Sequence, residues 1–186
     1  RKEETLTIRR LLVDASDKLV VLSDKYIQRF ITAYEIPTEY ECKFMSIANP
    51  TRYPYSPNTV DLSGKEKEIL MVARLAEIQK RISLALMIWK HVEDSGNLNG
   101  WKFTIVGEGP DENNYRQLAE KLNLRSVYFE GRQESLPYYR SASVLAMTSS
   151  FAGFGMVLTE AMQTGVMPVA FDSFDKLHDI VSDGRN

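Results

Sequence analysis

Residues 149–170 read SSFAGFGMVLTEAMQTGVMPVA, an order typical of a strand end, a glycine-flanked turn, a helix and a short apolar strand. Gly153 and Gly155 have no Cβ, so a ligand can approach the backbone of the turn closely. The helix that follows begins with N–H groups that have no partner inside the helix, which favours an anion there. Glu160, on that helix, is placed to accept a hydrogen bond from a hydroxyl group. The stretch therefore predicts a site for a nucleotide diphosphate joined to a sugar.

Short apolar strands alternate with amphipathic helices from residue 65 onward. Near-continuously apolar strands between helices indicate a parallel sheet that is covered on both faces. We therefore expect a Rossmann-like α/β domain with an open, doubly wound parallel sheet, whose ligands bind at the carboxyl ends of the strands. Strands are expected at 67–73, 102–106, 126–131, 143–148 and 167–171, and helices at 80–94, 111–122, 134–141, 156–164 and 174–182.

The first fifty residues follow a different pattern and end in a proline-rich segment. The elements expected there are a helix at 6–15, a strand at 18–23, a helix at 24–33 and a strand at 41–49. The segment NPTRYPYSPN (49–58) is typical of a connection rather than of the interior of an element. We expect the closing segment of one domain over 1–50, a linker over 51–64 and a second, truncated domain over 65–186. The chain has no initiator methionine and stops within a pattern, so we expect it to be a piece of a longer protein.

Composition excludes several classes of protein. With 44% hydrophobic residues the chain can bury a sizeable core, and a net charge of −2 gives no basic footprint for nucleic acid. No apolar run approaches the roughly 20 residues of a membrane span, and no signal-peptide pattern is present. Cys42, the single cysteine, excludes an internal disulfide, and we expect it to be a small buried hydrophobic residue. One cysteine and two histidines leave few ligands for a transition metal.

Two cations follow the first strand of the second domain, in the run VARLAEIQKR. The spacing places Arg74 at the end of the strand and Lys80 at the start of the next helix, both at the ligand-binding edge. There they would hold a diphosphate and stabilise the negative charge that builds on it when its sugar leaves. On the residues alone, a solvated surface suits the pair better, and Arg81 is a basic neighbour to which we assign no binding role.

The Gly-Glu-Gly-Pro turn at 107–110 connects a strand to a helix. It lacks the third glycine of the dinucleotide-binding G-x-G-x-x-G motif, because Glu112 stands at that position. No acidic ribose ligand is identifiable about 20 residues later. A Rossmann oxidoreductase or a flavodoxin-like carrier is therefore the weaker alternative. We expect a tight turn with Pro110 in the first helical turn and with Asp111 complementing the dipole of that helix.

Together these motifs resemble the retaining family 4 glycosyltransferases, also described as glycosyl transferases group 1, which have the two-domain GT-B fold. The V-x-R-L run, the G-x-G-P turn and the closing I-V-x-D-G run are similar to the family's, while Lys80 and Pro168 each stand one position later than in the family. The resemblance covers 65–186 well and 18–50 more loosely. The residues that match the family's main signature are Gly153, Phe154, Gly155, Glu160, Ala161, Met162, Gly165, Val169 and Ala170.

The resemblance implies a whole enzyme that moves a sugar from a nucleotide diphosphate to a glycan or lipid-linked acceptor, with retention at the anomeric carbon. Residues 65–186 would form the donor-binding domain, and residues 1–50 the closing segment of the acceptor domain. No metal, cofactor or nucleic acid would take part, and the donor would be a UDP-, GDP- or ADP-linked sugar. The expected setting is polysaccharide synthesis in the cytoplasm, at the inner face of the membrane where the acceptor is lipid-linked. The fragment alone would be inactive, because half of the interdomain cleft is missing.

The resemblance also assigns roles to single residues. Arg74 and Lys80 would be the catalytic clamp on the diphosphate. Glu160 would bind the ribose hydroxyls, and the backbone at 131–132 would pair with the nucleobase. The positions expected to bind the nucleotide are Gly107, Gly131, Arg132, Gly153, Phe154, Gly155, Met156 and Glu160.

Position 152 departs from the family. The family has a glutamate there, which would contact the hydroxyls of the donor sugar beside the anomeric carbon, where positive charge develops. Ala152 has no carboxylate, so it can neither contact those hydroxyls nor stabilise the developing positive charge. Three explanations fit this alanine: natural divergence, an inactive relative, or an engineered substitution. The main alternative function is therefore a nucleotide-sugar-binding module that keeps the fold and has lost the chemistry.

Overall fold

The computed structural model describes residues 2–54, 60–174 and 176–184, and the chain divides into two compact units, Arg1–Pro50 and Thr51–Asn186. The two units are described separately. The expected linker at 51–64 belongs entirely to the second unit, although its residues 55–59 lie outside the described residues.

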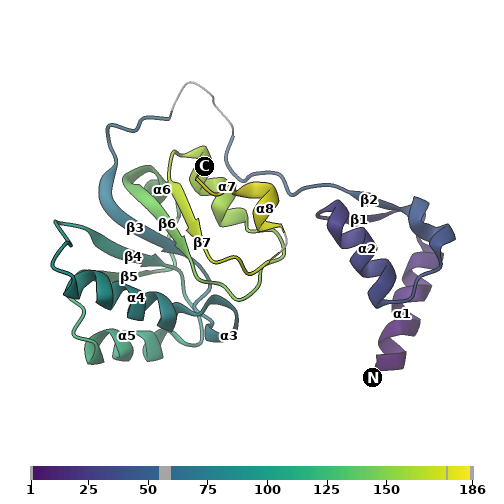
Figure 1. The fold of residues 1–186 in the computed structure, drawn as a ribbon, viewed down its shortest axis with the longest axis horizontal. Coiled ribbons are helices and arrows are strands. Elements are labelled where there is room, and N and C mark those ends of the chain that lie inside the picture. Colours follow the sequence, from purple (N-terminus) through teal and green to yellow (C-terminus); the bar gives the residue numbers. More distant parts are fainter. Residues whose placement is uncertain (1, 55–59, 175, 185–186) are drawn as a thin grey trace. The chain divides into compact units, whose positions relative to one another are not determined.

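The first unit is a small α/β assembly in which two short strands pair in parallel. Its core consists of Val13, Ile31, Ile36 and Phe44. The elements, labelled as in Figure 1, are α1 (Lys2–Ala15), β1 (Leu19–Val21), α2 (Asp24–Ala33), a 3₁₀ helix (Thr38–Lys43) and β2 (Phe44–Ser46).

Two expectations for this unit were wrong. The strand expected at 41–49 covers only 44–46, because the 3₁₀ helix that follows Pro37 takes up residues 38–43. Cys42 is exposed rather than buried, since it lies on that helix, and its Sγ donates to the Glu39 carbonyl at 3.4 Å.

The second unit confirms the predicted open, doubly wound parallel sheet, in the order β5-β4-β3-β6-β7 (Figure 1). Each predicted strand and helix has a counterpart there; β4 has the predicted bounds, and the other elements have shifted ends. The elements are β3 (Glu66–Val72), α3 (Glu77–Lys80), α4 (Ile82–Asp94), β4 (Lys102–Val106), α5 (Glu112–Lys121), β5 (Val127–Gly131), α6 (Leu136–Ser141), β6 (Ala142–Met147), α7 (Met156–Gln163), β7 (Met167–Ala170) and α8 (Leu177–Ile180).

Helices cover both faces of the sheet, as the apolar strands predicted. On one face α4 and α5 pack through residues such as Leu86 and Tyr115 onto Phe103 and Ile105. On the other face α6, α7 and α8 pack through Tyr139, Leu158 and Leu177 onto β3 and β6. The two helix layers are visible on either side of the strands in Figure 1.

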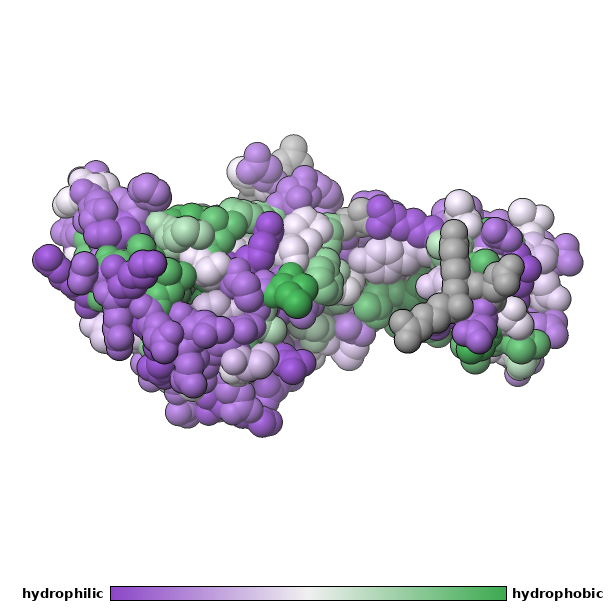
Figure 2. All heavy atoms as spheres, turned by 90° about the horizontal axis from the view of Figure 1, so that it is seen from below, coloured by the Kyte–Doolittle hydropathy of each residue, from purple (hydrophilic) through white to green (hydrophobic). Residues whose placement is uncertain are grey.

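The edge strand β7 leaves apolar side chains in solvent. Met167 and Val169 on β7 and Phe171 just after it are exposed. The face of the molecule in Figure 2 is mostly hydrophilic, and apolar patches interrupt it.

Near the carboxyl ends of the strands the structure differs from expectation at Arg81 and Pro110, and it gives Asp111 a further role. The helix expected at 80–94 is interrupted at Arg81, whose φ of 48° separates α3 from α4. Asp111 is the N-cap residue of α5 but makes no side-chain capping hydrogen bond to that helix; its carboxylate accepts a hydrogen bond from the Glu77 N–H at 2.8 Å and so caps α3. Pro110 precedes α5 rather than lying in its first turn.

The connections after β3 and β4 lie in direct backbone contact. The Ala73 N–H donates to the Val106 carbonyl at 3.0 Å, and the Leu75 N–H donates to the Glu108 carbonyl at 2.9 Å. A Cβ built on Gly107, whose φ is 141°, would lie 1.9 Å from the Ala73 carbonyl oxygen. Only glycine fits at this position, because an L side chain is excluded both by the backbone conformation and by the neighbouring strand connection.

We therefore expect Gly107→Ala to lower the free energy of unfolding by at least about 3 kcal/mol, since the clash is with backbone and cannot be relieved by a rotamer change. Urea denaturation followed by tryptophan fluorescence measures this in the second unit, which holds both tryptophans, Trp89 and Trp101. The matched control is Gly100→Ala, where φ is 83° and nothing lies within 4 Å of the added Cβ. It should cost only about 1–2 kcal/mol. Equal losses for the two variants would contradict the steric argument.

Candidate functional site

A cleft of about 1000 Å³ opens at the carboxyl ends of β3 and β4. The strand order reverses between β3 and β6, so β3 borders the point where open α/β sheets bind ligands. The cleft is lined by residues 72–74, 79–80, 106–110 and 132–133, together with Arg52, Glu112, Ser135 and Val157.

Four of the predicted site residues line this cleft together: Arg74, Lys80, Gly107 and Arg132. They come from the connections that follow β3, β4 and β5, so the fold brings them together as the sheet topology requires. Gly131 lies just behind them at the end of β5, where its carbonyl accepts a hydrogen bond from the Gly107 N–H at 2.7 Å.

Two of the cations in the cleft are already neutralised by carboxylates. Arg132 lies 3.2 Å from the Glu108 carboxylate, and Arg52 lies 3.1 Å from that of Glu134. Both pairs are exposed, and such pairs contribute little to stability. They nevertheless reduce the positive charge that these two side chains offer to a ligand.

Arg74 and Lys80 differ, because within the described ranges neither has a hydrogen bond or an ion pair from its side chain to the protein. Lys80 is partly buried, and burial lowers the pKa of its ammonium group. A buried ammonium without a partner is costly, so this site favours an anionic ligand. Together the two side chains give the cleft two positive charges that the protein does not compensate.

The helix that carries Lys80 is fixed to the end of β6. The Thr148 hydroxyl donates to the Lys80 carbonyl at 2.8 Å, and the Ser150 N–H donates to the Gln79 carbonyl at 2.8 Å. In the opposite direction, Arg81 Nε donates to the Thr148 carbonyl at 2.8 Å. Arg81 is not among the residues that line the cleft, so it supports the loop rather than the ligand.

The glycine turn before α7 brings the start of that helix to the cleft. Gly155 is the N-cap residue with a φ of 81°, and a Cβ there would lie 3.0 Å from the Phe174 ring. Val157, in the first turn of α7, lines the cleft, whereas 153–156 do not. The Phe154 side chain is buried, with the Lys176 ammonium 5.6 Å from the centre of its ring. The side chain of Phe154 therefore packs, and only the backbone here can serve a ligand.

Glu160 is 8% exposed and is held by the core. The Tyr139 hydroxyl donates to Glu160 Oε2 at 3.0 Å. Burial and the neighbouring Glu160 charge raise the pKa of Tyr139, so the phenol remains a donor. In the part of the chain that the structure describes, no protein group donates to Oε1 of Glu160, but Glu160 is not among the residues that line the cleft.

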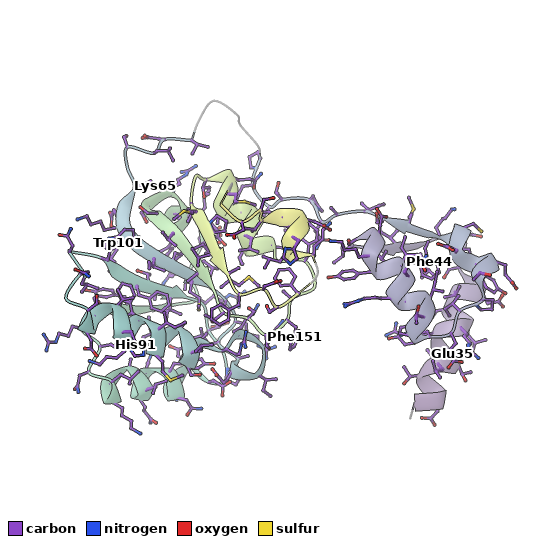
Figure 3. The ribbon with its side chains drawn as sticks, viewed as in Figure 1. Glu35, Phe44, Lys65, His91, Trp101 and Phe151 are labelled. Atoms are coloured by element: carbon purple, nitrogen blue, oxygen red, sulfur yellow. The ribbon has the colours of Figure 1, made fainter. Side chains whose placement is uncertain are left out.

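Ala152 is partly buried and packs against the cluster formed by α6, α7 and the sheet. It does not line the cleft. The adjacent Phe151 is exposed at the carboxyl end of β6, where Figure 3 labels it.

Several residues of the cleft were not predicted, among them Arg52, Gln79, Gln133 and Ser135. Gln79, Gln133 and Ser135 lie in connections that the sequence placed at this edge, but nothing in their identity distinguished them. Arg52 lies in the segment expected to be a linker, so only its long-range contacts reveal it.

His91, on α4, lies away from Phe151 in Figure 3. His178 pairs with Asp172 at 2.9 Å in an exposed position.

Among the described residues, no three or more His, Cys, Asp or Glu side chains gather as a metal site would require. Within the same residues, no helix combines the length and the apolar character needed to cross a membrane.

The sequence is similar to bacterial glycosyltransferases. The amylovoran biosynthesis glycosyltransferase AmsD of Erwinia amylovora is 30% identical over 172 residues, which cover 90% of this chain and 47% of that protein. The lipopolysaccharide 1,6-galactosyltransferase of Salmonella typhimurium is 26% identical over 178 residues, which cover 89% of this chain and 44% of that protein. The chain thus spans about half the length of these relatives.

Solved structures share the fold. A mutant of S. aureus TarM, in complex with fondaparinux, α-GlcNAc-glycerol and UDP, superposes with a TM-score of 0.82 at 22% identity, over 100% of this chain and 36% of TarM. Anabaena HepE, in complex with UDP and glucose, superposes with a TM-score of 0.68 at 21% identity, over 96% of this chain and 52% of HepE.

The family model described as glycosyl transferases group 1 matches residues 56–186, which is most of the chain. This match confirms the resemblance to the group 1 glycosyl transferases that the sequence motifs indicated. The chain therefore belongs to the group 1 glycosyl transferases.

Proposed function

We propose that this chain binds the nucleotide diphosphate of an activated sugar, and that the whole enzyme transfers the sugar to an acceptor with retention at the anomeric carbon. The observation behind the proposal is the pair of uncompensated cations, Arg74 and Lys80, in a cleft beside the reversal point of the sheet. A diphosphate supplies the negative charge that balances these two cations. The start of α7, where backbone N–H groups favour an anion, lies beside the cleft.

The roles divide along the cleft. Arg74 and Lys80 hold the diphosphate and stabilise its negative charge as it leaves, and the partial burial of Lys80 strengthens that interaction. Backbone amides in the first turn of α7 bind the phosphates. Glu160 accepts hydrogen bonds from the ribose through its free oxygen, while Tyr139 fixes the other oxygen. The backbone at 131–132 takes the nucleobase.

The acceptor is proposed to be a glycan or a lipid-linked glycan, at the cytoplasmic face of the membrane. Support comes from the relatives named for amylovoran and lipopolysaccharide synthesis. The acceptor would bind to parts of the protein outside this chain. We expect the chain alone to bind donor and not to transfer sugar, since much of such a rate comes from aligning two substrates.

A second function rests on Ala152, which places a methyl group where the family has a carboxylate. A nucleotide-sugar-binding module without catalysis would keep the cleft and the two cations and lose only this group. Both functions require the same ligand, so they differ in turnover and not in binding.

We expect calorimetric titration of the chain with UDP, GDP and ADP to show saturable binding of one of them. Arg74→Ala should weaken that binding about tenfold to a hundredfold, because a charge-assisted contact contributes about 1.5–3 kcal/mol. Arg125→Ala is the control, since Arg125 is exposed and lies just before β5, at the opposite edge of the sheet. Equal affinity for the Arg74 and Arg125 variants would contradict the assignment of the cleft.

We also expect the affinity for UDP to fall as the pH rises from about 7 toward the ordinary lysine pKa of about 10.4. Burial lowers the pKa of Lys80 in the free protein, so its charge is lost early as the pH rises, whereas a bound diphosphate would favour the charged form. Over this range the phosphates of UDP are already ionised, since their last pKa is about 6. Lys80→Arg remains charged over this range and should give a clearly shallower fall. The same slope in both proteins would refute the role of Lys80.

In the longer protein we expect Ala152→Glu to raise the rate of sugar transfer at least about tenfold, because a carboxylate beside the anomeric carbon stabilises the positive charge that develops there. The assay uses UDP-, GDP- and ADP-linked sugars, with the unchanged longer protein as the reference. A variant that stays inert with every donor while still binding the nucleotide would favour the binding module.

A further inference from the structure

Arg52 lines the same cleft as Arg74 and Lys80, although it lies in the segment that leads out of the first unit. Its neighbours among the lining residues include Gln133 and Ser135, from the connection after β5. This is the end of the cleft where we place the nucleobase. Arg74 and Lys80 come from the connection after β3.

The segment that contains Arg52 is fixed to the second unit by its neighbour Tyr53. The Tyr53 hydroxyl lies 2.9 Å from Ser135 Oγ, and its ring packs edge-on against Tyr139 with 6.2 Å between ring centres. The Tyr53 carbonyl accepts a hydrogen bond from Gln163 Nε2 at 3.3 Å. Arg52 is therefore presented from an anchored backbone and not from a free connection.

The guanidinium of Arg52 is held in place while its side chain remains 58% exposed. Its Nη2 donates to Glu134 Oε2 at 3.1 Å, and its Cζ lies 5.8 Å from the centre of the Tyr53 ring. Glu134 neutralises its charge, and the planar group keeps an open surface. A neutralised planar group suits a flat, uncharged ligand better than a phosphate.

We propose that Arg52 is a nucleobase-binding residue, whose guanidinium stacks on the base of the donor and forms one wall of that end of the cleft. This inference rests on the proposed function, since it requires a nucleotide donor. It adds a contact from a segment outside the strand connections that form the rest of the cleft. Stacking on a guanidinium suits any base, so the contact adds affinity without choosing between bases.

The test compares UDP with inorganic pyrophosphate, which has the diphosphate and no base. Both are titrated into the chain and into its Arg52→Ala, Arg52→Lys and Arg74→Ala variants. We expect Arg52→Ala and Arg52→Lys each to weaken UDP about fivefold and to leave pyrophosphate unchanged, because lysine keeps the charge and loses the plane. Arg74→Ala should weaken both ligands.

Two outcomes would overturn the inference and leave the proposed function intact. One is that Arg52→Lys or Arg52→Ala binds UDP with the same affinity as the unchanged chain. The other is a loss of pyrophosphate binding in Arg52→Ala as large as its loss of UDP, which would mark a phosphate contact. A chain that binds none of UDP, GDP, ADP and pyrophosphate overturns the proposed function and this inference with it. Thermal unfolding should be the same in all Arg52 variants, since an exposed ion pair contributes little to stability.

Discussion

The backbone contact between the connections after β3 and β4 is the constraint on which the cleft depends. Gly107 and Gly109 leave no side chain between the two connections, so hydrogen bonds join residues 73 and 75 directly to 106 and 108. These bonds fix the backbone on both sides of Arg74. Asp111 then fixes the start of α3, because its carboxylate accepts a hydrogen bond from the Glu77 N–H. The backbone that carries Arg74 and Lys80 is thus positioned by two glycines. These glycines act only by allowing the connections to approach each other.

Much of the fold could be predicted from the sequence, because its dominant signals are local. Apolar strands between amphipathic helices determined the parallel sheet and both helix layers. The errors occurred where tertiary contacts decide the outcome. Asp111 was expected only to complement the dipole of the helix that follows it, and the cap that its carboxylate provides to a helix 34 residues earlier was not foreseen. Cys42 was expected in the core because of its residue type, and a 3₁₀ turn exposes it.

The candidate site could be predicted in part, for a related reason. Arg74, Lys80 and Gly107 follow strands, so their place at the carboxyl edge depends only on the topology of the sheet. Arg52 reaches the cleft through contacts with residues more than 80 positions away, and no local pattern contains that information. Glu160 was predicted from its motif, but its partner Tyr139 could not be, because that pairing depends on how α6 packs against α7.

The reciprocal bonds between α3 and the end of β6 limit how this protein can change. The Thr148 hydroxyl holds the Lys80 carbonyl, and Arg81 holds the Thr148 carbonyl in return. Lengthening or shortening either loop would break the hydrogen bonds that join it to the other loop. The loop at α3 and the loop after β6 can therefore be exchanged between homologues only together. Recombination that divides the domain between residues 81 and 148 places the two donors in different parents, so the bonds persist only where one parent supplies the arginine and the other the threonine.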